Sequence, residues 1–416
     1  MPLGRPELLS SPRAVPRRRL LALTLLPAVT GCATILRLDA PPPGVAIDLP
    51  VLGIPNARFW PDGPPEALRR EAALMLARQR ARSAGPLPPA NFLALSGGGD
   101  NGAYGAGLIT GWTATGTRPE FDIVTGISAG ALIAPFAFLG PEYDPALRTV
   151  FTEVARPDIL LLRHIPLALL FNVALADTSP LYRLIAQQAD ERMLAAIARE
   201  YARGRLLLIG TTNLDLQRPV VWNIGAIAAS GHPQALGLFR RILLASASIP
   251  GAFPPVLIDV QYHGHPYQEM HVDGGAATQV FLYPPALYAR NLADPHAEPR
   301  QRTVWVVRNG RLDVEGMSVN RGLFTIASRS IATLLHFSGV GDISRIFLIA
   351  QRDGLAFRLS YIGSNFTAER REPFDQAYMR ALFEYGAHKM LSGEAWVEAP
   401  PATGTLRATA DRAVIR

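Results

Sequence analysis

The most constraining feature of the chain is a short segment that predicts an abrupt change from strand to helix. It reads DIVTGISAGAL, at residues 122–132. The β-branched residues before Gly126 favour a strand, and the alanine and leucine residues after Ser128 favour a helix. Because Gly126 and Gly130 carry no side chain, Ser128 can lie exposed at the turn, at a helix N-terminus that favours negative charge. The segment predicts a nucleophilic serine at residue 128; the alternative is a turn serine that caps a helix.

A group of glycines lies upstream, directly after an apolar run. The segment FLALSGGGDNGAYGAGLITGW contains Gly97, Gly98, Gly99, Gly102, Gly105 and Gly107. Glycine is used where φ is positive or where another atom approaches the backbone closely, so the stretch predicts a binding loop. Consecutive glycine N–H groups can point into one cavity and stabilise an oxyanion or a phosphate. A nucleotide site is disfavoured, because the segment lacks the lysine of a P-loop and the glycine order of the dinucleotide fingerprint.

Runs typical of strands alternate with helical runs through the middle of the chain, which indicates an α/β sheet with crossover helices. The strand-like runs include NFLAL, FDIVTG, RLLLIGTTN, PVVWNI, RTVWVVRNG and SRIFLIAQ. The helical runs include ALIAPFAFL and, near the C-terminal end, FDQAYMRALFEYGAHKML. With 416 residues, of which 49% are hydrophobic and 18% charged, the chain is long and apolar enough for a large packed core.

The N-terminus has the layout of a secretory signal. Arg17, Arg18 and Arg19 precede the apolar run LLALTLLPAV, which is too short for a comfortable membrane span, and VTGC then ends at Cys32. VTGC resembles the lipobox of bacterial lipoproteins, whose cysteine is acylated and becomes the first mature residue. The alternative is a plain signal peptide with a chance cysteine. Because the sequence holds a single cysteine, at the cleavage point, we expect Cys32 to be lipidated.

The lipoprotein interpretation predicts a location and a partner. An alanine after the lipidated cysteine, here Ala33, usually goes with the outer membrane. The expected location is therefore the bacterial cell envelope, with acyl chains on Cys32 holding the protein on a membrane. Nucleic acid is not an expected partner although the net charge is +7. Residues 1–31 hold five arginines against one glutamate, which leaves +3 for the rest of the chain.

Composition divides the chain into four expected segments. Residues 1–31 are the signal peptide. Residues 32–90 hold the lipidated N-terminus, a proline-rich tether at 38–66 and an amphipathic helix at 67–83. Residues 91–398 are the folded domain, and residues 399–416 are a flexible tail.

The clearest downstream candidate is the segment HVDGGAA, in which Asp273 precedes two glycines. An aspartate at a strand end can reach into a site, although D-G-G is also a common tight turn. An ordinary α/β-hydrolase would need a histidine as base. His271 could lie on the same strand face as Asp273, which makes it a reserve candidate for proton transfer. The cluster of His263, His265 and His271 lacks a carboxylate at ligand spacing, so we favour a polar hairpin over a metal site and expect no cofactor.

Taken together and in this order, the glycine loop, the G-x-S-x-G segment and the D-G-G aspartate resemble the motifs of the patatin-like phospholipase family. The resemblance runs from Phe92 to Ala277 and includes DTSPLYRLI, TTNLDLQRPVVW and LLASASIPGAFPPV. It implies a three-layer α/β/α fold with a central, mostly parallel sheet. It also implies that residues 91–398 are a catalytic domain that hydrolyses acyl esters of lipids without a cofactor.

The resemblance implies a role for each motif. Ser128 is then the nucleophile and Asp273 its activating base, in a Ser-Asp dyad that works through an acyl-enzyme intermediate. The oxyanion hole would be formed by the backbone N–H groups of Gly97, Gly98 and Gly99.

Two positions depart from the family pattern. Asn101 stands where the loop commonly carries an arginine, and the position after D-G-G that is often asparagine lies within AATQV. A phospholipid head group is therefore less strongly implied than a generic acyl ester. Two other functions stay open. One is a Ser-His-Asp α/β-hydrolase, for which a histidine such as His271 must be essential. The other is a catalytically idle envelope lipoprotein that binds a lipid or a partner.

Overall fold

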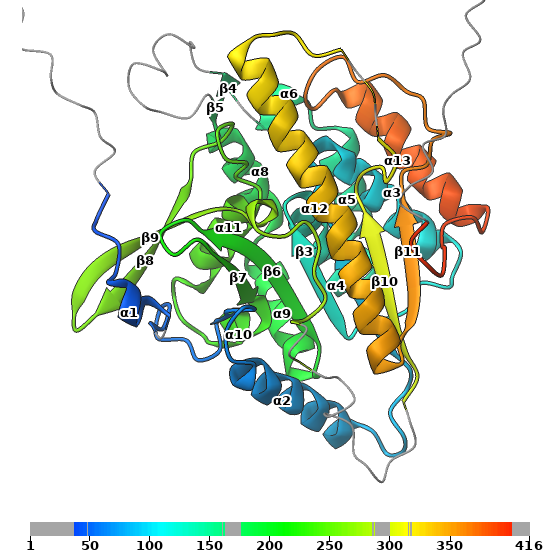
Figure 1. Cartoon of the computed structure of the whole chain (residues 1–416). Helices are drawn as coiled ribbons and strands as arrows, with labels where there is room; N and C mark the ends of the chain where they lie inside the picture. Colours follow the sequence, from blue (N-terminus) through cyan, green and yellow to red (C-terminus); the bar gives the residue numbers. More distant parts are fainter. Residues whose placement is uncertain are drawn as a thin grey trace, which may run out of the picture.

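The computed structural model describes residues 37–47, 49–159, 161–162, 176–284, 287, 300–314, 316 and 318–401. Its centre is a nine-stranded sheet in the order β1-β7-β6-β3-β2-β10-β11, with β9 also paired to β6, and β8 to β9 (Figure 1). Strands β6, β3, β2, β10 and β11 are parallel to one another. Strands β1, β7, β8 and β9 pair antiparallel to their neighbours.

The strands of this sheet are β1 (Arg58–Phe59), β2 (Ala90–Leu95), β3 (Ile123–Ile127), β6 (Leu206–Asn213), β7 (Arg218–Asn223), β8 (Val256–Tyr262), β9 (His265–Asp273), β10 (Arg302–Arg308) and β11 (Ala356–Tyr361). A separate small hairpin pairs β4 (Leu161–Leu162) with β5 (Ala176–Asp177). The helices are α1 (Pro43–Ala46), α2 (Glu66–Arg82), α3 (Gly102–Ala114), α4 (Ala129–Leu139), α5 (Asp144–Thr152), α6 (Arg156–Ile159), α8 (Ser179–Gln188), α9 (Glu191–Ala202), α10 (Ile224–Ala229), α11 (Ala235–Ser246), α12 (Leu323–Asp353) and α13 (Gln376–Leu391), with 3₁₀ turns η1 (Gly99–Asn101), η2 (Pro141–Tyr143) and η3 (Gly274–Ala276).

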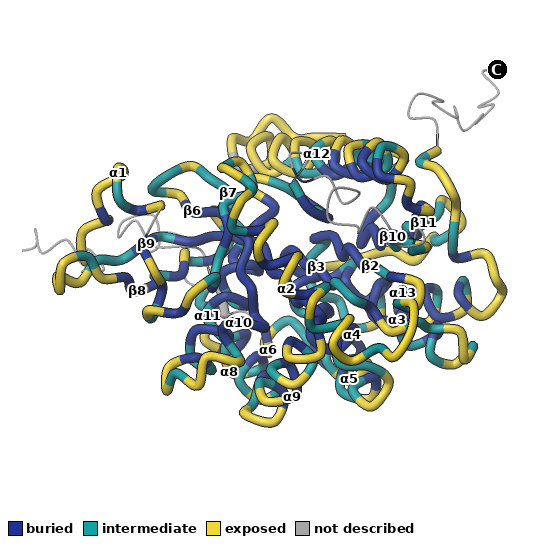
Figure 2. Tube along the Cα trace, turned by 90° about the horizontal axis from the view of Figure 1, so that it is seen from below, coloured by how far each residue is buried: buried dark blue, intermediate teal, exposed yellow. Residues whose placement is uncertain are grey.

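Different helices cover the two faces of the sheet. On β2, Leu93 and Leu95 belong to the core shared with α3, α4, α5, α8, α11 and α13. Phe92 and Ala94 belong instead to the core shared with α2 and α12. Successive strand residues point to opposite faces, so these two clusters are the two sides of one sheet. Figure 2 shows α12 on one side of the strands and α3, α4 and α5 on the other. The predicted three-layer α/β/α arrangement is confirmed.

Half of the glycine-rich segment is helix rather than loop, because its later glycines lie in α3. A Cβ at Gly107 would lie 1.9 Å from the carbonyl oxygen of Phe383, and one at Gly111 would lie 2.8 Å from Ala387. Phe383 and Ala387 belong to α13, so these two glycines let two helix backbones approach closely. The binding loop that the sequence predicts is confined to residues 97–101.

The proline-rich segment at 38–66 is not the tether that its composition predicted. Leu49, Val51 and Ile54 are buried in the main core. Strand β1 pairs with β7, and Arg58 donates from Nη2 to the carbonyl oxygen of Leu49 (3.1 Å). Proline limits regular hydrogen bonding but does not prevent burial, and the aliphatic residues between the prolines supply the apolar contacts. The folded body therefore begins before residue 91, and α2 agrees with the helix expected at 67–83.

The predictions for the chain ends lie largely outside the described residues. These are the signal peptide at 1–31, the lipidated Cys32 with Ala33, and residues 402–416 of the expected tail.

Helix α12 contains the run SRIFLIAQ, which the sequence analysis predicted as a strand. A short continuous apolar run is compatible with either a buried strand or a buried helix. Here Ile343, Ile346, Ile349 and Ala350 recur at helical spacing and are buried against the sheet. The strand next to β10 is instead β11, which follows this helix.

Candidate active site

Ser128 lies at the turn between β3 and α4, as the sequence predicted. Its backbone has φ 53° and ψ −123°, a conformation that is costly for a residue other than glycine. A Cβ at Gly126 would lie 2.5 Å from the carbonyl oxygen of Gly130, and one at Gly130 would lie 2.4 Å from that of Leu95. Both flanking glycines are therefore required by close packing. The Ser128 N–H donates to the Ser246 hydroxyl (3.0 Å), which fastens the turn to α11.

Asp273 ends β9 and lies beside Ser128. The two residues are 5% and 6% exposed, respectively. The Asp273 carboxylate accepts a hydrogen bond from the Gly275 N–H (2.7 Å), and the Ser128 side chain lies close enough to this carboxylate to lower its pKa. Burial raises the pKa of Asp273 to about 6, although Ser128 and the Gly275 N–H both lower it. This carboxylate is more basic than an ordinary aspartate and lies beside the Ser128 side chain.

The glycine loop passes beside this pair, at the carboxyl end of β2. An ideal Cβ on Gly97 would lie 3.2 Å from the Ser128 Cβ. The Gly97 N–H donates to the carbonyl oxygen of Gln279 (3.0 Å), so it is not available to an oxyanion, contrary to the prediction. The N–H groups of Gly98 and Gly99 are not used in the hydrogen bonds of the described residues. The structure therefore leaves two of the three expected donors available.

Asn309, which the sequence analysis missed, holds the glycine loop in place. It follows β10, whose strand lies next to β2. Its Nδ2 donates to the carbonyl oxygen of Ser96 (2.7 Å), and its Oδ1 accepts from the Gly105 N–H (3.0 Å). A Cβ at Gly98 would lie 2.1 Å from the Asn309 carbonyl oxygen. A polar residue at the carboxyl end of a parallel strand was the signal that could have found it.

Arg308 places a positive charge against the same loop. Its side chain is buried, and its Nη1 lies 3.5 Å from the carbonyl oxygen of Gly97 and 3.4 Å from the Gln279 amide oxygen. Burial lowers the pKa of Arg308 to about 10, against the opposing effect of Asp342. The loop carries Asn101 where an arginine is common in the resembling family, and the cation beside Gly97 comes from the end of β10 instead.

Asn101 and Asp100 fasten the end of the loop to the C-terminal part of the chain. Asn101 accepts a hydrogen bond from the Tyr378 hydroxyl (2.6 Å), and Tyr378 lies in α13. Asp100 is buried and accepts hydrogen bonds from Arg370 (3.0 Å) and from the Phe374 N–H (3.1 Å). The residue that replaces the family arginine thus has a positioning contact.

His271 lies in a different, fully buried network. Its Nδ1 is 3.0 Å from the Thr211 hydroxyl, and its Nε2 is 3.1 Å from the Glu269 carboxylate. Burial lowers the pKa of His271, against the opposing effect of Glu269. Burial alone would raise the pKa of Glu269, but His271 and the cation of Arg58 lower it to about 2. Both ring nitrogens therefore have partners other than Ser128.

The other two histidines of the HGHPYQEMH segment lie at a hairpin. Tyr262 pairs with His265 across a two-residue turn of His263 and Gly264, both with positive φ. Within the described residues, no group of three or more His, Cys, Asp or Glu side chains is arranged to hold a metal ion.

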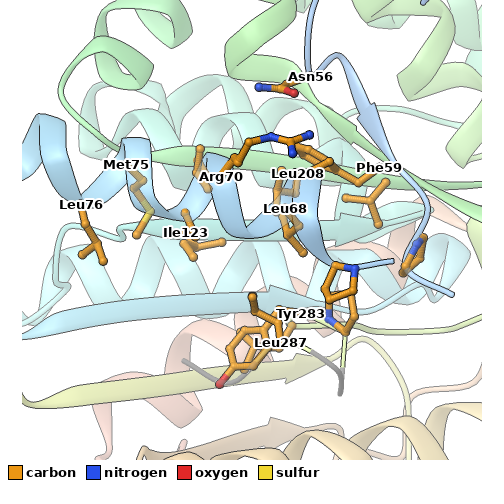
Figure 3. A pocket seen from close by; sticks show the side chains of 18 of the residues that line it. Asn56, Phe59, Leu68, Arg70, Met75, Leu76, Ile123, Leu208, Tyr283 and Leu287 are labelled. Atoms are coloured by element: carbon orange, nitrogen blue, oxygen red, sulfur yellow. The ribbon is translucent and has the colours of Figure 1, made fainter. Parts of the chain in front are cut away.

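A large apolar cavity lies away from the dyad, near the amino ends of the strands. It measures about 1360 Å³ and lies between α2, the preceding N-terminal segment and the sheet (Figure 3). Its lining includes Leu68, Met75 and Leu76 of α2, with Ile123, Leu208 and Tyr283 facing them. Neither Ser128 nor Asp273 lines it. The cavity is therefore separate from the candidate active site.

The chain is similar to several solved structures, including the following three. The first is VipD from Legionella pneumophila, with 11% identity and a TM-score of 0.31, over 74% of this chain and 67% of VipD. The type III effector ExoU has 12% identity and a TM-score of 0.29, over 74% of this chain and 54% of that protein. Human GIVD cytosolic phospholipase A2 has 13% identity and a TM-score of 0.31, over 74% of this chain and 53% of that one. The chain thus spans about half the length of the last two. No significant match was found among curated proteins.

The family comparison is more direct. Residues 93–286 match the family model described as patatin-like phospholipase. The matched segment contains the glycine loop, Ser128 and Asp273. The structure brings the side chains of Ser128 and Asp273 together. Residues 93–286, a little under half of the chain, are therefore similar to the patatin-like phospholipase family over the segment that holds all three motifs.

Proposed function

We propose that this protein is a lipid acyl hydrolase that cleaves carboxylic esters of membrane lipids, with Ser128 as nucleophile and Asp273 as general base. The observation that carries the proposal is the contact of the Ser128 side chain with a buried carboxylate whose pKa is raised to about 6. A carboxylate of this pKa is largely ionised at neutral pH and is still more basic than an exposed aspartate. It can therefore accept the serine proton directly.

The proposed reaction has two halves. In the first, the Ser128 oxygen attacks the ester carbonyl carbon while its proton passes to Asp273, and the carbonyl oxygen becomes an oxyanion. The N–H groups of Gly98 and Gly99 would stabilise that charge. Collapse of the intermediate breaks the bond to the alcohol, which leaves with the proton from Asp273. In the second half, Asp273 takes a proton from water as the water oxygen attacks the acyl-serine carbonyl. Collapse of this intermediate breaks the bond to the Ser128 oxygen, which takes the proton back from Asp273, and the fatty acid is released.

The strained backbone at Ser128 supports the nucleophile assignment. A positive φ at a serine costs free energy and persists only where the surrounding packing enforces it. Here the enforcing contacts are those of Gly126 and Gly130, which turn the chain sharply into α4. The strain presents the hydroxyl to Asp273 rather than to the helix.

We also propose that Cys32 is lipidated and holds the enzyme on a membrane of the bacterial cell envelope, by inference the outer membrane. The lipobox-like VTGC segment and Ala33 support this. Tethering would keep the enzyme next to an insoluble substrate. Cys32→Ser is expected to abolish incorporation of a labelled fatty acid into the protein; equal labelling of the variant and its parent would contradict lipidation.

The deciding experiment compares turnover of a short-chain nitrophenyl ester and of a fluorescent phospholipid by residues 33–416. Ser128→Ala and Asp273→Asn are each expected to lower kcat by at least about 10³-fold, because the two residues act as a unit. His271→Gln serves as the matched control, since His271 is buried nearby but bonds Thr211 and Glu269. Loss of turnover in the folded control would favour a Ser-His-Asp mechanism. A folded parent that is inert on both substrates would favour a lipid-binding lipoprotein.

A further inference from the structure

Helix α12 consists of two parts with opposite environments. From Ile343 onward it is packed on the sheet, with Ile343, Ile346 and Ile349 buried. From 323 to 338, none of the side chains that the structure describes is buried. Figure 2 shows the change along the helix, from exposed at one end to largely buried at the other. We call residues 323–338 the α12 overhang.

The overhang begins at the candidate active site. Asp342 accepts hydrogen bonds from the Gln279 N–H (2.7 Å) and from the Thr278 hydroxyl (2.8 Å), just after the D-G-G turn. Gly339 lies against the Arg308 guanidinium, where a Cβ would be 2.8 Å away. Since a helix rises about 1.5 Å per residue, Leu323 lies about 24 Å along the axis from Gly339. The helix therefore projects past the carboxyl ends of the strands, on the side of the dyad (Figure 1).

The exposed surface of the overhang is apolar on one side. Its exposed large apolar residues are Leu323 (79%), Ile326 (48%), Ile331 (46%), Leu334 (70%) and Phe337 (58%). At 100° per residue, their spacing puts all five within a stripe about 140° wide. The residues outside this stripe are Thr325, Ser328, Arg329, Thr333 and His336, together with Phe324, Ala332 and Leu335 at one edge and on the far side. This is the pattern of a helix that lies at an interface between water and an apolar phase.

The charge of this region fits an anionic surface. The sequence has no aspartate or glutamate from residue 316 to residue 341, while Arg329 lies in the overhang and Arg321 lies just before it. Basic residues beside an apolar helix face are attracted to anionic lipid head groups. Helix α12 is also the helix, among those described, that is long and apolar enough to cross a membrane. Because its second part is packed on the sheet, only the overhang is free to enter lipid.

We propose that the α12 overhang docks the enzyme on an anionic lipid surface, with its apolar stripe among the acyl chains and the dyad facing that surface. The proposal rests on the proposed function, because an enzyme that acts on membrane lipids must bring its site to them. Docking by this helix differs from tethering by Cys32. The tether limits distance, whereas the overhang fixes which side of the protein meets the membrane.

The test uses residues 33–416, which retain every described residue and lack the proposed lipid anchor. Binding is measured by flotation with vesicles of roughly three parts phosphatidylethanolamine to one part phosphatidylglycerol. The protein carries Ser128→Ala, so that the vesicles stay intact. The double variant Leu334→Ser/Phe337→Ser is expected to bind at least about tenfold more weakly than its parent. Leu391→Ser is the matched control. Leu391 is as exposed as Phe337 (58%) but ends α13, about 20 Å along that helix from Tyr378 at the glycine loop.

A second readout, with Ser128 restored, separates docking from chemistry. The double variant is expected to keep its turnover of the soluble nitrophenyl ester and to lose at least about tenfold in hydrolysis of vesicle phospholipid. Equal vesicle binding by the double variant and its parent overturns the proposal. The proposal is also overturned if the parent is a dimer and the double substitution converts it to a monomer without changing vesicle binding. The stripe would then be an interface between two copies of the chain. If neither protein hydrolyses any ester, the proposed function fails, and the flotation result still decides the docking.

Discussion

The two ends of the same parallel strands have opposite properties. At the carboxyl ends, β2, β3 and β10 lead into the glycine loop, Ser128 and Asn309, where backbone atoms approach so closely that several positions have no space for a Cβ. At the amino ends, α2 lies over a cavity of about 1360 Å³ lined mainly by apolar side chains. The candidate active site needs hydrogen-bond donors and a nucleophile in fixed positions, and it lies at the end of the sheet where close packing fixes the backbone. The loosely filled end has no comparable constraint.

The largest expected difference between the two ends concerns glycines. Gly98→Val places a side chain where a Cβ would be 2.1 Å from the Asn309 carbonyl oxygen, so the loop must shift and its N–H groups move. Loss of such a donor raises the barrier by about 2.7–4 kcal/mol, so kcat is expected to fall by about 10²–10³-fold. The control is Gly85→Val, because Gly85 lines the cavity and has nothing within 4 Å of its ideal Cβ. Equal ester turnover by the two folded variants would contradict the comparison.

A second prediction concerns pH and Asp273. Because the base must be ionised, kcat/KM is expected to rise with pH through about 6 and to level off above it. The raised pKa also has a stability consequence. The pKa of Asp273 is 3.8 in the unfolded chain and about 6 in the folded chain. The protonated carboxyl group therefore contributes stability that is fully present below pH 3.8 and is lost as the pH rises through about 6.

Asp273→Asn removes the buried charge that destabilises the fold above about pH 6. At pH 8 the variant is therefore expected to have a free energy of unfolding about 3 kcal/mol higher than its parent, and below about pH 4 the two are expected to be equal. Thermal unfolding of the variant and its parent at both pH values checks this, and Asp259→Asn is the exposed control. A gain that is the same at both pH values would mean that the ionisation of Asp273 is not its cause.

The smallest expected effect comes from adding volume at each end. Ala72 lines the cavity, and Ala72→Leu is expected to raise the free energy of unfolding by about 0.5–1 kcal/mol without changing turnover. Ala131 is buried behind the Ser128 turn, and its Cα would lie 2.8 Å from a Cβ on Gly126. Ala131→Leu is expected to lower the free energy of unfolding by about 1–3 kcal/mol. Chemical denaturation of both variants measures the difference; destabilisation by Ala72→Leu would mean that the cavity is not free to be filled.

The features that the sequence could predict are those whose residues lie close together along the chain. The turn at Ser128 and the loop at 97–99 are local, so a few neighbouring residues were enough to find them. The contact of Asp273 with Ser128 joins distant parts of the chain, and it was expected from the family resemblance rather than from spacing. Asn309 lies more than two hundred residues from Ser96, and no pattern near either residue indicated that they would bond. The run SRIFLIAQ was misassigned because buried strands and buried helices share its composition.

The position of β10 bears on where this domain can be cut. The family match ends at residue 286, yet β10 lies between β2 and β11 in the interior of the sheet. A fragment that stopped at 286 would leave the edge of β2 unpaired, and exposed edges of this kind invite pairing with other chains. Fragments and fusion proteins should therefore retain the chain through β11 and α13, because the sheet extends beyond the segment that matches the family model.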